Sequence, residues 1–121
     1  MDSSITVVLR YRDGRTERAS LVETDIDSQI VRVTREDGAA EDVPFSTLKA
    51  IFFPRTSAQS TLEEPAGSTI AVEFADGETI RGVAQYNPER NGFFLFPLDR
   101  SKNDRIFVVN AAIVSIEVEK L

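Results

Sequence analysis

The nine residues FADGETIRG, Phe74 to Gly82, decide the expected fold of this chain. Apolar and polar residues alternate up to Phe74, as they do in a β-strand with one buried face. Asp76-Gly77 follows, a favoured pair for a two-residue hairpin turn because both turn positions require a positive φ. The stretch therefore predicts two antiparallel strands joined at Asp-Gly.

The same pattern occurs earlier in the chain as YRDGRTERA, Tyr11 to Ala19. Each copy has an aromatic residue, a spacer and Asp-Gly, and then Thr and Arg at matching places. A shift of 63 residues places Val7 on Ile70, and the apolar residues before the two turns then coincide. The agreement predicts an internal repeat.

The rest of each half aligns with one change of length. The shift of 63 places Val33 on Phe96. A two-residue insertion within Leu98 to Arg105 then changes the shift to 65, which places Ile51 on Ile116. Hairpin loops tolerate insertions, so this is the pattern that a duplicated fold would leave.

A stretch rich in Ser, Thr, Pro and Ala separates the two copies, from Pro54 to Thr69. Its composition is typical of a linker. We therefore expect a first unit at residues 1–55, a linker at 56–68 and a second unit at 69–121. A unit of about 55 residues buries only about 60% of its unfolded surface. The two units are thus expected to pack on each other, or the chain to oligomerise.

No segment has the helical spacing of apolar residues over about ten positions. Each half instead contains five short strand-like segments. A tight turn precedes the last one, at Ser46-Thr47 in the first half and at Ala111-Ala112 in the second. Five strands joined in this way form a small, strongly bent SH3-like barrel. The predicted fold is all-β, with two tandem five-stranded barrels related by the repeat.

The second half resembles the Sm-like family, which includes Sm, LSm and Hfq-type proteins. The resemblance rests on the pattern V-x-F-x-D-G-x-x-I-x-G at Val72 to Gly82 and on IFVVNAAIVSIEV at Ile106 to Val118. In that family a glycine lets the second strand bend sharply, and here it corresponds to Gly82, with Ala19 at the matching place of the first half. The resemblance implies tandem Sm-like barrels, which also occur in uncharacterised bacterial proteins.

The resemblance also implies a candidate RNA function, because Sm-like proteins form rings and bind RNA near their turns. Asn110 is the polar residue at the matching place. Arg100, Lys102 and Arg105 in the inserted loop are the accompanying basic candidates. The first half has Pro44 near its turn. Proline cannot donate a hydrogen bond to a neighbouring strand, so a ring built through that edge is not expected. RNA binding is therefore the alternative function and not the favoured one.

Composition argues against catalysis. The chain contains no His and no Cys, which removes the commonest general base, the commonest metal ligand and the thiol nucleophile. Neither a metal nor a cofactor is expected. The net charge of −6 disfavours non-specific binding to nucleic acid or to an anionic membrane. The N-terminus lacks the features of a signal peptide, so a cytoplasmic location is expected.

The most apolar run, FFLFPL at Phe93 to Leu98, carries the main functional hypothesis. Alternation along this run predicts that Phe94 and Phe96 point inward. The residues expected to point outward form the predicted interface: Phe52, Phe93, Leu95 and Pro97. An exposed apolar patch marks an interface, either between the two barrels or with an external partner or a second copy. The expected function is a non-catalytic binding or adaptor module.

Overall fold

The computed structural model describes residues 5–54, 67–85, 89–98 and 103–118. These ranges contain ten β-strands and two single-turn 3-10 helices. The first half contains β1 (Ile5–Tyr11), β2 (Thr16–Asp25), β3 (Ile30–Thr34), β4 (Ala40–Pro44), η1 (Phe45–Thr47) and β5 (Leu48–Pro54). The second half contains β6 (Ser68–Phe74), β7 (Thr79–Ala84), β8 (Gly92–Pro97), β9 (Asn103–Val109), η3 (Asn110–Ala112) and β10 (Ile113–Val118). The predicted all-β class is confirmed.

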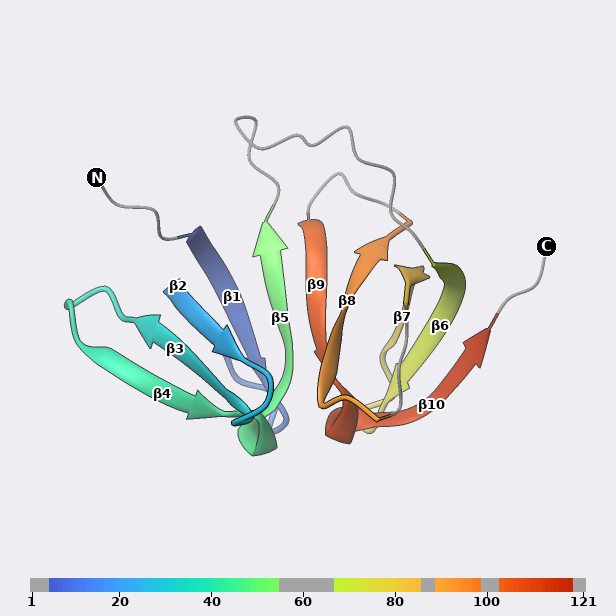
Figure 1. Ribbon diagram of the computed structural model, residues 1–121, viewed down its shortest axis with the longest axis horizontal. Helices are drawn as coiled ribbons and strands as arrows, with labels where there is room; N and C mark the ends of the chain where they lie inside the picture. The colour runs from blue at the N-terminus through green and yellow to red at the C-terminus, as the bar shows by residue number, and fades with distance from the viewer. Residues whose placement is uncertain (1–4, 55–66, 86–88, 99–102, 119–121) are drawn as a thin grey trace.

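All ten strands belong to one open antiparallel sheet, in the order β10-β6-β7-β8-β9-β5-β1-β2-β3-β4. Within each half the last strand pairs with the first, and the second, third and fourth follow in sequence. Pairing of β5 with β9 joins the halves, so Figure 1 shows these two strands at the centre and β4 and β10 at the outer edges. Most of the predicted linker, 56–68, lies outside the described residues.

The pairing of the first strand with the last strand follows equivalent registers in the two halves. Leu9 faces Ile51 in the first half, and Val72 faces Ile116 in the second. These pairs agree with the shifts of 63 and 65 residues read from the sequence. Neither helical turn in the described ranges is long and apolar enough to cross a membrane.

Gly82 allows two strands to approach closely. A Cβ at this position would lie 2.4 Å from the carbonyl oxygen of Phe96 and 2.5 Å from Cδ2 of Leu95. Gly82 faces Ile70, as Ala19 faces Val7 in the first half. The first half therefore has space for a methyl group where the second half has none.

The predicted orientation of β8 was wrong by one residue. Phe93 and Leu95 are 6% and 0% exposed, whereas Phe94 is 38% exposed. In β2 a bulge lies between Leu21 and Glu23, and Leu21 pairs with Val33. In the second half Ala84 occupies the place of Leu21, and it pairs with Leu95. The two paired residues are one residue closer along the chain than Leu21 and Val33 are. A one-residue change of register moves every side chain of a strand to the other face.

The predicted exposure of Phe52 was also wrong. Every residue from Leu48 to Phe53 is buried, because β5 lies at the centre of the sheet and its two faces are both covered. The guanidinium of Arg10 lies 4.3 Å from the centroid of the Phe52 ring. Phe52 therefore belongs to the junction within the chain.

An ionic cluster connects the two halves at this junction. Lys49, 5% exposed, donates to Asp76 across 2.7 Å and also pairs with Glu78. Arg10 contacts Glu78 at 3.3 Å. Glu78 aligns with Arg15 of the first copy, which instead pairs with Asp13 in its own turn at 2.7 Å. The two copies of the opening motif thus differ at the residue that contacts the other half.

Candidate functional site

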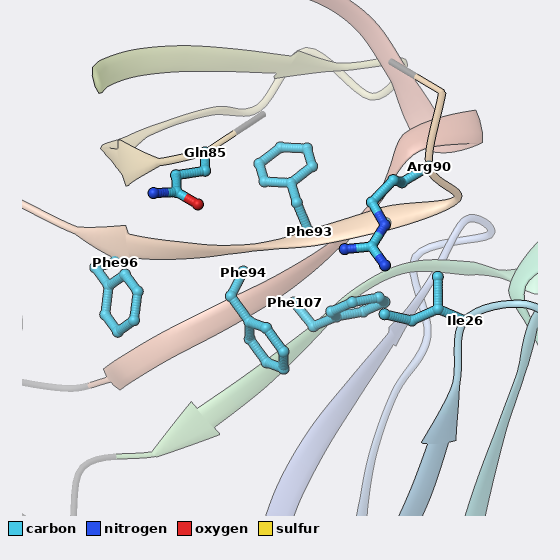
Figure 2. Close-up of a pocket in the computed structure, with 8 residues that line it drawn as sticks. Ile26, Gln85, Arg90, Phe93, Phe94, Phe96 and Phe107 are labelled. Carbon is cyan, nitrogen blue, oxygen red and sulfur yellow. The ribbon is translucent and has the colours of Figure 1, made fainter. Parts of the chain in front are cut away.

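An aromatic groove of about 310 Å³ lies where β8 and β9 meet the turn after β2. Figure 2 shows Phe94 and Phe107 on one side of β8 and Phe93 on the other. The lining residues of the aromatic groove are Ile26, Gln85, Arg90, Gly92, Phe93, Phe94, Phe96 and Phe107. Ile26 comes from the first half, so the groove is completed only when the halves are joined.

Ring contacts hold Phe94 in place although it is partly exposed. Its centroid lies 5.1 Å from that of Phe107 and 5.8 Å from that of Phe53, both in edge-to-face geometry. The guanidinium of Arg105 lies 5.3 Å from the Phe94 centroid and 4.6 Å from the Phe53 centroid. Such contacts stabilise ring positions. The groove therefore presents a preorganised aromatic surface.

Gly92 lets the beginning of β8 approach the floor of the groove. A Cβ there would lie 2.3 Å from Cζ of Phe107, inside the ring's own volume. Phe107 is completely buried and lies directly opposite Phe94 in the sheet. The depth of the groove near Phe107 thus depends on a glycine.

A second, polar groove of about 450 Å³ lies between η1 and η3. Its lining residues are Arg12, Gln29, Phe45, Ser46, Arg90, Asn91, Val109, Asn110 and Ala111. Asn110 donates from its amide to the carbonyl of Arg90, and its backbone N–H donates to the carbonyl of Asn91 at 3.0 Å. Asn91 in turn donates to the carbonyl of Ile26 at 2.9 Å. These hydrogen bonds connect η3 with the segment before β8, and that segment with the first half, along one side of the polar groove.

The sequence matches a family of unknown function, DUF6982, over residues 3–120. The chain belongs to the DUF6982 family. No curated protein and no solved structure matches it. Because the function of the DUF6982 family is unknown, membership does not assign an activity to this chain.

The predicted protein interface is placed differently from the expectation. Phe93 and Leu95 point into the second half, although Phe93 also borders the aromatic groove. Pro97 is half-buried at the end of β8. Phe94 and Phe96, expected to be core residues, line the groove instead.

The predicted RNA residues do not form one site within the described ranges. Arg100 and Lys102 lie outside them. Arg105 is in β9 and packs on aromatic rings, whereas Asn110 lies in η3 beyond the other end of that strand. Asn110 instead shares the polar groove with Arg12 and Arg90. Neither arginine was among the predicted site residues.

The described residues offer no cluster suited to a metal ion. Within these ranges no group of three or more His, Cys, Asp or Glu side chains is arranged to hold one. In the acidic stretch Glu23 to Asp27, Asp25 accepts the backbone N–H of Ser28 at 3.0 Å, and this bond lowers the pKa of Asp25. Asp25 thus stabilises a turn.

Proposed function

We propose that this chain is a non-catalytic adaptor module whose aromatic groove receives an apolar side chain of a protein partner. One observation carries the proposal: Phe94 is 38% exposed and is held by Phe53 and Phe107 beside a concave surface. Rigid aromatic side chains in a concave surface are typical anchor points of protein interfaces. The partner is a separate protein or a second copy of the chain.

In this proposal the halves are tandem SH3-like barrels of the Sm-like type. The repeated strand order supports this, together with the equivalent pairs Leu9–Ile51 and Val72–Ile116. The duplication explains why one chain contains the groove. Ile26 of one half and β8 of the other come together through the pairing of β5 with β9.

RNA binding is the second candidate, and one observation favours it. Asn110 lines the polar groove together with Arg12 and Arg90, so an amide and two guanidinium groups border one concave surface. The net charge of −6 acts against it, because RNA affinity depends strongly on a positive surface. Protein binding is therefore the function that we favour.

A displayed library of random 12-residue peptides, selected against the intact chain, tests the favoured function. We expect enrichment of Phe, Trp or Leu, and at least a tenfold weaker affinity of selected peptides for Phe94→Ser, because one buried aromatic anchor contributes 2 kcal/mol or more. Val22→Ser is the matched control, since Val22 is an exposed apolar residue of β2 outside the groove. Absence of apolar enrichment, or unchanged binding by Phe94→Ser, would overturn the proposal.

A further inference from the structure

Two arginines that pair with no carboxylate of the described residues line the same groove. Other cationic residues of the described ranges form salt bridges, among them Arg10, Arg15, Arg32, Arg35 and Lys49. Arg12 and Arg90 are exposed and pair with no carboxylate of the described residues, although the chain contains 20 acidic and 14 basic residues. Both lie at the polar groove. In a chain with excess carboxylates, this arrangement leaves two positive charges for an external anion.

The remaining lining of the polar groove is suited to an anion. It includes Gln29, Ser46, Asn91 and Asn110, and none of the described residues that line it is Asp or Glu. Arg12 is fixed at its base, because its Nε donates to the Leu48 carbonyl at 3.2 Å and its backbone N–H donates to the Thr47 carbonyl at 3.0 Å. A guanidinium held in this way can present its terminal N–H groups to a carboxylate in bidentate geometry.

Arg90 connects this groove with the aromatic groove. It lines both, and Figure 2 shows its side chain extending towards Phe107 and Ile26. A ligand that crosses Arg90 can therefore place an apolar group near Phe94 and an anionic group near Arg12. The two grooves form one amphipathic surface.

We propose that the polar groove binds carboxylates, and that the partner is an acidic segment with an apolar side chain next to Asp or Glu. This inference rests on the proposed function and names the partner's chemistry. A nucleic acid fits less well, because it needs a broad positive surface and the chain carries a net charge of −6. Two arginines are enough to bind the few carboxylates of a peptide that also carries one apolar anchor.

The same peptide selection tests the inference through the composition of the selected peptides. We expect Asp and Glu to be enriched within a few residues of Phe, Trp or Leu. Apolar enrichment without acidic enrichment would overturn the inference and leave the proposed function standing. Acidic enrichment alone would support the carboxylate site and overturn the aromatic anchor. A pool with neither enrichment would overturn both.

Variants then locate the acidic contact. Arg12→Gln and Arg90→Gln should each weaken binding of a selected acidic peptide about tenfold, the effect expected from losing a charge-assisted hydrogen bond. Arg18→Gln is the matched control, because Arg18 is also exposed and lines neither groove. Equal affinities for the two groove variants and the control would overturn the assignment.

Binding of a 20-nucleotide single-stranded RNA tests the alternative ligand. We expect it to bind at least tenfold more weakly than the acidic peptide at 0.15 M salt. Tighter RNA binding that falls steeply with added salt and is lost in Arg12→Gln with Arg90→Gln would overturn the peptide inference in favour of RNA. Replacing Asp and Glu of the selected peptide by Asn and Gln should remove its dependence on the two arginines.

Discussion

Lys49 donates from Nζ to Oδ2 of Asp76 across 2.7 Å, and this bond joins β5 of the first half to the β6–β7 turn of the second. The lysine is buried, whereas its carboxylate partners, Asp76 and Glu78, are about half exposed. The two halves of the sheet are therefore fixed by a lysine in one copy and by acidic residues in the turn motif of the other.

Removing the acidic side of this cluster should destabilise the chain more than removing the lysine. With Asp76→Asn and Glu78→Gln, Lys49 stays buried without a carboxylate, so we expect a clear decrease in the urea midpoint. Lys49→Met should change the free energy of unfolding by less than about 1 kcal/mol, because apolar residues often replace buried ion pairs without loss. Circular dichroism during urea titration measures both, with Asp13→Asn in the equivalent turn as the control. A larger loss for Lys49→Met would contradict this account.

Stability should decrease in acid through Glu17. Its pKa is lowered, chiefly by the hydrogen bond from Arg35 and also by that from the Tyr11 hydroxyl, which lies at 3.0 Å. A carboxyl group with a lowered pKa in the folded state stabilises the fold above its ordinary pKa, and this contribution is lost as pH falls through the folded-state pKa. The melting temperature should therefore fall as pH drops below about 4.5, the ordinary value.

The variant Glu17→Gln isolates this contribution. It should melt below the wild type at pH 7, and the difference should shrink as the pH falls through the lowered folded-state pKa of Glu17, because the wild-type carboxylate then becomes protonated as well. Differential scanning calorimetry at several pH values makes the comparison. A difference that stays constant down to the lowest pH at which both proteins remain folded would show that the charge of Glu17 does not stabilise the fold.

Adding a methyl group at Gly82 should destabilise the fold more than removing the methyl group of Ala19. Gly82→Ala should cost about 1–3 kcal/mol, because its Cβ would overlap the backbone of Phe96 and the side chain of Leu95. Ala19→Gly should cost only about 0.5–1 kcal/mol, the usual effect of glycine within a regular element. Chemical denaturation of the two variants gives both values. Equal costs would mean that the second half relaxes around the added methyl group.

The local features of this fold were predictable from the sequence. Alternation and the two Asp-Gly pairs placed the hairpins, because side-chain period and turn position are set within a few residues. The expected turn type was wrong, since Gly14 and Gly77 have a positive φ whereas Asp13 and Asp76 do not. The shift of 63 also predicted the equivalence of Val7 with Ile70, which the pairings of both residues match.

The features that depend on long-range contacts were not predictable in the same way. Nothing in the local pattern of β5 indicates that it pairs with β9, or that Lys49 meets Asp76. The aromatic groove needs Ile26 and Arg90, which come together only through that pairing. The alignment of β3 with β8 was wrong by one residue because β2, the equivalent of β7, contains a bulge that alternation cannot reveal.

The orientation of β8 gives the last prediction, since it assigns different roles to adjacent phenylalanines. Phe93→Ala should cost about 3–5 kcal/mol, because Phe93 is 6% exposed and packs in the core of the second half. Phe94→Ala should cost only about 1–2 kcal/mol, since the ring is partly exposed and loses mainly its aromatic contacts. Urea unfolding followed by circular dichroism distinguishes them, and peptide binding should show the reverse dependence among variants that remain folded. If Phe94→Ala were the more destabilising change, β8 would present its other face to the core, and the aromatic groove would lose its anchor.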